Sequence, residues 1–403
     1  MVLPKLNKNS TMMSSTSRKP GSSMTPLLAL SLVVVTALLA LFFSDVISNI
    51  TKNTTAIPDL RSDPPSRYKC FESQDELRTA IIMGGSQDTM DSITGFYDFL
   101  KPNSSVSRTY GYPIGTWCVK KVDDFQSIFQ NLVNFNVPLD QWNTNQVTDM
   151  SQMFMSAVEF NQFLYSFRTG NVRNMASMFE NTPDFNQPLE FLDVSKVTDM
   201  NTMFRASHFN RPLLDWDTGR VQNMKSMFET SLGFNKDLMF HTKSVTNMDR
   251  MFADSKAFNS RVHFKDLGKV QTMEAMFNVA EQFNQPISWP DTASLSNLRY
   301  MFLAAKRFNS DVRLNTSRVI NMNGMFSMAY SFNQQLQFDT QKVQFMDRMF
   351  EFASNFNQPL DFDISNLQSM GRMFHSATKF NQSLCSWALY YNPNTNPPVI
   401  NTT

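Results

Sequence analysis

The stretch FNVPLDQWNTNQVTDMSQMFMSAVE (135–159) decides the fold, because closely related stretches follow it through most of the chain. Another of them reads FNQPLDFDISNLQSMGRMFHSATK (356–379). The dipeptide Phe-Asn recurs at eleven positions that follow one another at intervals of 24 or 25 residues, and a second mark, Met-Phe, recurs with the same spacing. A fixed period of this length is typical of a solenoid, in which each unit packs mainly on its two neighbours.

The second half of each unit has the apolar spacing of a helix. In VTDMSQMF, the side chains of Met150, Met153 and Phe154 would lie on one helical face. Asp149, or Thr148 before it, offers a side-chain oxygen for a free N–H of the first turn. We therefore expect one short helix per unit, held in place by packing against neighbouring units.

The first half of each unit is expected to be extended. A proline precedes the apolar residue in several units, as at Pro138 and Pro359, and excludes a helix there. Leu360 and Phe362 then alternate with Asp361, which is typical of a strand with one buried face. The predicted fold class is an α/β solenoid that is leucine-rich-repeat-like, with a parallel sheet and a short helix in each of its 11–12 turns.

The Asn that follows each Phe predicts a feature of the turns themselves. A surface role would not require the same residue in successive units, whereas an Asn at a tight corner can bond the backbone of its own turn and of the next. We expect a buried Asn ladder under a Phe stack. The Met and Phe stripes are expected to be core packing rather than a cofactor site.

The repeats divide the chain. We assign residues 110–388 to the solenoid, residues 70–109 to its N-terminal cap and residues 389–403 to a disordered tail. Within the cap, FESQDELRTAIIM (71–83) predicts a helix that Ser73 and Glu76 would cap reciprocally.

The chain has three cysteines, and none has metal-ligand spacing. Cys70 and Cys118 flank the predicted cap, where a disulfide would need their Cα atoms within about 7 Å. Two small buried thiols are the alternative. Cys385, in the last unit, has no obvious partner.

The N-terminal part predicts a membrane anchor. Residues 27–43 read LLALSLVVVTALLALFF, and only basic charged residues precede them. We assign residues 1–25 to a cytosolic basic tail, 26–48 to a transmembrane signal anchor and 49–69 to a stalk. A cleaved signal peptide, which would release the protein, is the alternative. Asn103, Asn315 and Asn381 begin Asn-x-Ser/Thr sequences and are candidate N-glycosylation sites on the far side of the membrane.

Several function classes have no support in the sequence. The formal net charge is only +1, so no overall field favours a nucleic acid. No phosphate-binding glycine loop, nucleophile elbow or zinc-protease motif is present, and the four histidines fall at different positions of the repeat. Acidic residues look dispersed along the solenoid instead of lying in one register. We expect no catalysis, no cofactor and no metal site.

One position of the unit varies freely. It directly follows the buried Leu, Val or Ile of the extended half, and alternation points it away from the core. We call these residues the outward row; a row of mixed chemistry on a sheet is how solenoids bind partners, although an ordinary solvated face is the alternative. From unit to unit the row contains Asp140, Tyr165, Glu190, Leu214, Met239, His263, Ser288, Arg313, Gln337 and Asp361.

The units quoted above closely resemble the BspA-like leucine-rich-repeat surface proteins, the bacterial surface-protein repeat family. The lead-in YGYPIGTWCVKKVDDFQSIF (110–129) resembles the usual beginning of that family's first repeat. The resemblance covers about residues 70–388 and implies an extracellular rod or horseshoe that contacts other molecules. The uncleaved N-terminal membrane segment departs from the family pattern.

These features predict a membrane-anchored surface protein whose solenoid binds an extracellular protein or glycan. The predicted binding face contains Asp140, Tyr165, Glu190, His263, Arg313, Gln337 and Asp361. A structural spacer at the cell surface is one alternative, and an ecto-enzyme is another.

Overall fold

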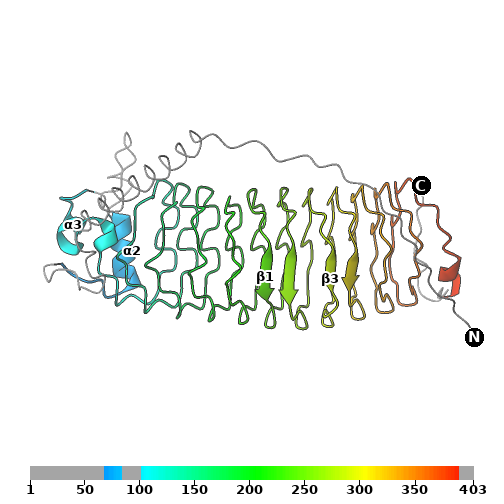
Figure 1. Cartoon of the computed structure of the whole chain (residues 1–403), viewed down its shortest axis with the longest axis horizontal. Helices are drawn as coiled ribbons and strands as arrows, with labels where there is room; N and C mark the ends of the chain where they lie inside the picture. The colour runs from blue at the N-terminus through cyan, green and yellow to red at the C-terminus, as the bar shows by residue number, and fades with distance from the viewer. Residues whose placement is uncertain (1–67, 84–100, 390–403) are drawn as a thin grey trace, which may run out of the picture. The chain divides into compact units, whose positions relative to one another are not determined.

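The computed structural model describes residues 68–83 and 101–389 (Figure 1). The predicted tail and anchor (1–25 and 26–48), nearly all of the stalk and residues 390–403 lie outside the described residues. Within the described part of the chain, no helix is long and apolar enough to span a membrane.

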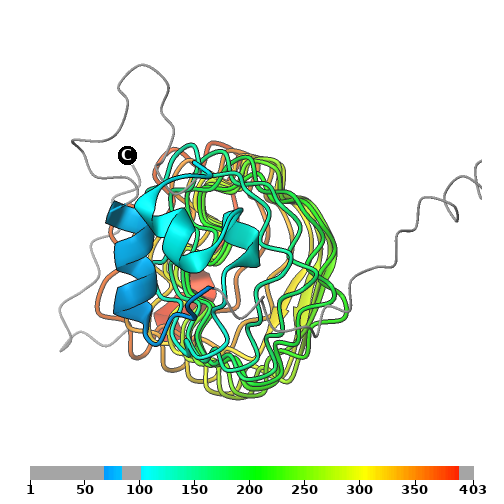
Figure 2. The ribbon, with the colours of Figure 1, turned by 90° about the vertical axis from the view of Figure 1, so that its left-hand side faces the viewer.

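The repeats form a solenoid of stacked turns, as the period predicts (Figure 1). Strand β1 (Leu238–His241) pairs in parallel with β2 (Val262–Lys265), and β3 (Ile287–Trp289) pairs in parallel with β4 (Val312–Leu314). A second line of parallel contacts joins one residue of each turn to its equivalent in the next. This line runs through Asp124, Asp149, Asn174, Asp199, Asn223, Asn247, Thr272, Asn297, Asn321, Phe345 and Ser369. Viewed along the stack, the turns superimpose around one interior (Figure 2).

The short helix predicted in each unit is wrong. The backbone N–H of Met150 donates to the carbonyl of Asn174 in the next turn (3.0 Å), and that of Phe154 donates to Met178 (3.0 Å). Within the unit, the N–H of Met153 reaches the carbonyl of Met150 (3.3 Å), the i to i+3 bond of a β-turn. An α-helix would instead use these donors for its own i to i−4 bonds. Consecutive β-turns bury the same apolar positions as the predicted helix.

Left-handed backbone accompanies these turns. Gln152 has φ 57° and Ser156 has φ 58°, and equivalent residues of the other described turns repeat the pair. A non-glycine residue in this region costs about 1–2 kcal/mol. The hydrogen bonds between turns offset that cost, because they pair N–H groups that the turn would otherwise leave unsatisfied.

Two stacks of phenylalanine rings fill the interior. One stack contains the Phe of Phe-Asn and the other contains the Phe of Met-Phe. Phe154 stacks on Phe160, the first residue of the next unit (3.9 Å between centroids), and also on Phe179, the equivalent Phe of that unit (5.6 Å). Met150 and Met153 are fully buried beside them. Core packing therefore accounts for both the Phe and the Met stripes.

The Asn ladder is present, but it is not buried. The side-chain oxygen of Asn259 accepts the backbone N–H of Asn284 (2.9 Å), and the same bond links successive Phe-Asn residues from Asn136 to Asn381. Asn259 and Asn284 are exposed, and other members are half-buried. The ladder therefore lies at the surface, next to the Phe stack.

The N-terminal end of the solenoid carries two helices (Figure 2). Helix α2 (Gln74–Met83) begins after Ser73, whose hydroxyl accepts the N–H of Glu76 (3.2 Å). Gln74 donates to the main-chain carbonyl of Gln126 in the first turn (2.8 Å). Helix α3 (Ser105–Tyr110) precedes the 3₁₀ helix η2 (Ile114–Thr116), and a last 3₁₀ helix, η3 (Cys385–Leu389), ends the described chain.

A disulfide joins Cys70 to Cys118, with 4.6 Å between their Cα atoms. This confirms the predicted bridge over the alternative of two separate thiols. The bond ties the segment before α2 to the first turn. Cys385 is free and exposed.

Candidate binding face

The outward row follows from strand geometry. In β1 and β2, Leu238 is buried while Met239 and His263 are exposed and directly opposite each other in the parallel pair. In β3 and β4, Ser288 and Arg313 are paired in the same way. Successive side chains of a strand point to opposite faces, so in these four strands the residue after the apolar Leu, Ile or Val points to solvent. The other six residues of the row lie outside the strands of the described chain, so the sheet predicted for every turn is present in only four of them.

The structure brings the predicted face residues into this row. Asp140, Tyr165, His263, Arg313, Gln337 and Asp361 are exposed, and Glu190 is half-buried. Their exposure confirms the predicted orientation of the row. Whether the row binds a partner stays a prediction.

An exposed aromatic cluster lies at one part of this face. The ring of Tyr165 stacks on that of Phe163 (5.0 Å between centroids) and meets that of Phe191 at the same distance and a steeper angle. Tyr165 is 55% exposed and Phe163 is 46% exposed. Of these three residues, only Tyr165 belongs to the predicted binding face. Several other units have a Pro at the position of Phe163. The Phe in place of that Pro is the sequence signal that could have placed Phe163 on this face.

The apolar character continues along the row. Leu214 and Met239 are exposed (51% and 43%), and they lie in the two turns that follow Glu190. Exposed large apolar side chains that adjoin one another on a rigid surface are typical of interaction sites.

A polar hollow lies on the same face near Arg313. A cavity of about 520 Å³ has polar side chains along most of its lining, those of Asp311, Arg313, Asn315, Gln334, Gln335 and Gln337. The guanidinium of Arg313 lies 3.4 Å from the carboxylate of Asp311, and both side chains are largely exposed. A pair exposed to this degree contributes little to stability, so Arg313 can exchange this contact for another.

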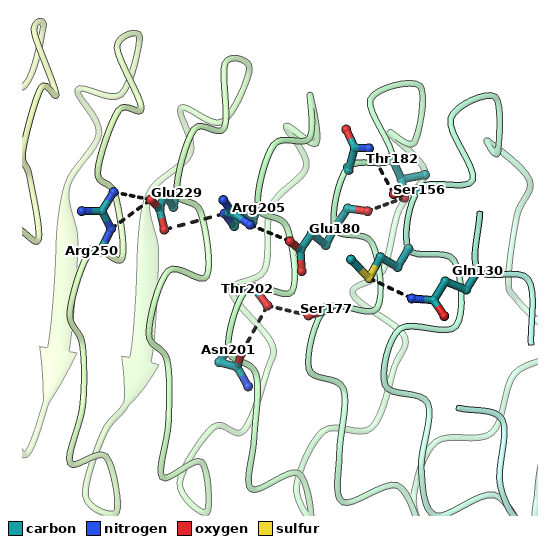
Figure 3. Close-up of polar contacts among 12 residues, drawn as sticks. Gln130, Ser156, Ser177, Glu180, Thr182, Asn201, Thr202, Arg205, Glu229 and Arg250 are labelled. Atoms are coloured by element: carbon teal, nitrogen blue, oxygen red, sulfur yellow. Dashed lines mark hydrogen bonds and ion pairs between the residues drawn. The ribbon is translucent and has the colours of Figure 1, made fainter. Parts of the chain in front are cut away.

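The consecutive β-turns carry a second charged arrangement (Figure 3). The guanidinium of Arg205 is 2.7 Å from the Glu180 carboxylate and 3.8 Å from that of Glu229. Arg250 continues the series, with its Nε 2.9 Å from Glu229. The expectation of acidic residues dispersed over different registers is therefore wrong here, because Glu180 and Glu229 both directly follow the Met-Phe mark.

The two glutamates of this series are almost fully buried. Burial by itself raises the pKa of Glu229, but hydrogen bonds from Arg250 and Ser226 and the charges of Arg250 and Arg205 outweigh it. The net pKa of Glu229 lies below its usual value. The hydrogen bond to Glu229 in turn raises the pKa of Arg250. The series is a set of satisfied ion pairs that joins adjacent turns.

Neighbouring polar contacts have the same structural character. The hydroxyls of Ser177 and Thr202 lie 2.6 Å apart, and Asn181 donates to Ser156 (3.1 Å) (Figure 3). Each contact links equivalent positions of adjacent turns. Among the described residues, no group of three or more His, Cys, Asp or Glu side chains is arranged to hold a metal ion.

The predicted glycosylation sites differ in accessibility. Asn103 and Asn381 are exposed. Asn315 is half-buried, and its side-chain oxygen accepts the N–H and the hydroxyl of Ser317. Asn103 and Asn381 are therefore the better placed of the three for modification.

Comparison with known proteins adds one finding. A family model described as "Mycoplasma protein of unknown function, DUF285" matches five overlapping segments, residues 101–207, 186–288, 238–314, 256–337 and 312–396. No curated protein matches the chain. The matched residues include the whole outward row.

Proposed function

The chain belongs to the DUF285 family of proteins of unknown function, and on this premise we propose that it is a membrane-anchored surface protein whose solenoid binds an extracellular protein or glycan through the outward row. The solenoid supplies a rigid frame, because backbone hydrogen bonds join each turn to the next. Side chains on such a frame are held in position before binding, which lowers the entropy lost on association.

The aromatic cluster is the observation that carries this proposal. The ring of Tyr165 contacts those of Phe163 and Phe191, and all three rings lie on the exposed face rather than in the core. Tyrosine and phenylalanine are enriched in the centres of interfaces, since they bury a large area with few rotatable bonds. Aromatic rings also contribute the apolar contact surface that recognises sugars and peptides alike.

Two further features support an extracytoplasmic location. The apolar run at 27–43, after a purely basic segment, fits an anchor over residues 26–48 with the N-terminus in the cytosol. Disulfides such as Cys70–Cys118 persist in oxidising compartments. The resemblance to BspA-like surface proteins agrees with this location.

A binding comparison tests the proposal. The full chain would be presented to arrays of glycans and extracellular proteins beside a Tyr165→Ala/Phe191→Ala variant. Leu232→Ala, which removes an apolar side chain of similar exposure outside the cluster, is the matched control. We expect ligands that the wild type and the control retain and that the double variant loses by at least about tenfold. Equal binding by all three proteins would refute a role for this face.

A structural spacer is a second candidate that one observation favours. The inter-turn hydrogen bonds extend from the first described turn to the last, so the solenoid resists extension and bending along its length. A spacer would show no localised ligand, and changing the number of repeats would alter its function in proportion to length. Loss of function in the Tyr165→Ala/Phe191→Ala variant, at unchanged length, would argue against it.

A further inference from the structure

We infer that the partner of the outward row is a second copy of this chain, which lies antiparallel against the first. This inference rests on the proposed function, because it uses the same face and names the molecule that the face binds. The argument comes from the order of side chains along eight successive positions: Asp140, Tyr165, Glu190, Leu214, Met239, His263, Ser288 and Arg313.

Two identical faces can meet through a two-fold axis that lies in the interface and parallel to the strands. This axis turns the second solenoid end for end and keeps each repeat position opposite its equivalent. The outward row of one copy then faces the outward row of the other in reverse order. The first of the eight positions meets the eighth, the second meets the seventh, and the fourth meets the fifth.

The reversed order is complementary in charge. Asp140 of one copy meets Arg313 of the other, and by symmetry each such pair occurs twice. Glu190 meets His263, whose imidazole can donate a hydrogen bond to the carboxylate. Apart from Tyr165, only these four of the eight positions have an acidic or basic side chain. Each of the two acids faces one of the two bases.

The remaining positions are complementary in shape and polarity. Leu214 of one copy meets Met239 of the other next to the two-fold axis. Both exposed aliphatic side chains of the row are therefore covered at the centre of the interface. Tyr165, the largest side chain of the eight, meets Ser288, the smallest. Burying large apolar side chains at the centre with charges outside them is the usual arrangement of a protein interface.

The register of the pair is specific. A shift by one turn, about 4.8 Å, places Asp140 opposite Ser288 or Gln337 and Glu190 opposite Met239 or Ser288. Both the Asp140–Arg313 pair and the Glu190–His263 pair are lost in either direction. The antiparallel order also puts the two copies of α2 at opposite ends of the pair, which suits molecules that project from two facing membranes.

Engineered cysteines test the register directly. In a Cys385→Ser background, the full chain would carry Tyr165→Cys together with Ser288→Cys, at positions that the two-fold axis brings together but that lie five turns apart within one chain, too far for a bridge inside it. The matched control carries Tyr165→Cys with Asp361→Cys, two exposed positions that the axis keeps apart. On mild oxidation we expect a covalent dimer, seen by non-reducing electrophoresis, for the first pair at several times the yield of the control. Equal yields, or no dimer from either, would overturn the inference.

A charge exchange gives an independent measurement in the full chain. Asp140→Arg alone and Arg313→Asp alone each oppose like charges, and we expect each to weaken self-association, measured by sedimentation, about tenfold or more. The double variant Asp140→Arg/Arg313→Asp restores opposite charges and should return to within about threefold of the wild type. A double variant as weak as the single variants would contradict the antiparallel pair. If self-association is absent while the Tyr165→Ala/Phe191→Ala variant still loses an array ligand, the second copy is the wrong partner but the proposed function stands.

Discussion

The carboxylate of Asp249 accepts the backbone N–H of Glu274 in the next turn, with 2.7 Å between oxygen and nitrogen. In most turns, an Asn or Asp two residues earlier accepts this N–H, as Asn297 does for Arg299 (3.1 Å). Thr272 occupies the earlier place before Glu274, and its hydroxyl lies at 3.5 Å. Asp249 therefore supplies an acceptor that the local sequence lacks.

The same exchange occurs in two other turns. Where Phe345 replaces the Asn or Asp, Asn323 of the preceding turn accepts the N–H of Asp347 (2.7 Å). Where Ser369 replaces it, Asp347 accepts the N–H of Gly371 (2.7 Å). A substitution in one turn is thus compensated by a side chain of the turn before it. Burial raises the pKa of Asp249 and outweighs the lowering effect of its hydrogen bonds from Thr272 and Glu274.

Asp347→Ala removes such a compensating acceptor. We expect a loss of about 1–3 kcal/mol in the free energy of unfolding, because the N–H of Gly371 is left without a protein partner. Denaturant unfolding followed by the fluorescence of Trp387, which is buried in the last unit, would report it. Asp361→Ala, an exposed aspartate on the outward row, is the control and should change stability by less than about 0.5 kcal/mol. Equal effects of the two substitutions would contradict the compensation.

Asn259→Ala tests the surface ladder. The substitution removes the acceptor for the N–H of Asn284. Because water can reach this exposed site, we expect a loss of about 0.5–1.5 kcal/mol, at the level of an ordinary hydrogen bond. Amide hydrogen exchange would show the N–H of Asn284 losing protection while that of Phe283 is less affected. Unchanged exchange at Asn284 would exclude a stabilising ladder.

The ion-pair series predicts a dependence on pH. The pKa of Glu229 is lowered in the folded protein, so its stabilising effect is complete above the unfolded value of about 4.3 and is lost as the pH falls through the folded pKa. The difference in stability between the wild type and Glu229→Gln should therefore be largest near neutral pH and shrink in acid.

Denaturant midpoints at pH 7 and in steps below pH 4.3 would measure this difference. Arg250→Ala removes the principal hydrogen-bond donor to Glu229 and should weaken the pH dependence. A difference between wild type and Glu229→Gln that is constant across this range would refute the lowered pKa.

A side chain at Gly324 would collide with the neighbouring turn. It has φ 58°, and a Cβ atom there would lie 2.5 Å from the ring of Tyr300 in the preceding turn. Gly324→Ala should lower stability by about 1–3 kcal/mol, from left-handed strain and from displacement of the ring. Thermal unfolding would show the loss, and adding Tyr300→Ala should recover part of it. No recovery in the double variant would mean that the ring is not the obstacle.

The sequence by itself determined the period, the identity of the core residues and the orientation of the outward row. These follow from spacing, because Met150 and Phe154 must be buried and Tyr165 must alternate with a buried neighbour in any stacked repeat. The bridge between Cys70 and Cys118 was also predictable as one of two alternatives. The surface position of the Asn ladder was not, since a repeated Asn satisfies the backbone of the next turn equally well at a buried or an exposed corner.

Only the tertiary structure decided how the backbone of each unit is satisfied. The spacing of Met150, Met153 and Phe154 fits a helix and a series of β-turns equally well, because it records which side chains are buried and not where the N–H groups donate. Those N–H groups donate to the next turn, so their partners lie 24 residues or so away and leave no local signal. The contacts of Glu229 with Arg205 and Arg250 likewise depend on how turns of 24 and 25 residues align, which is a property of the stack and not of any single unit.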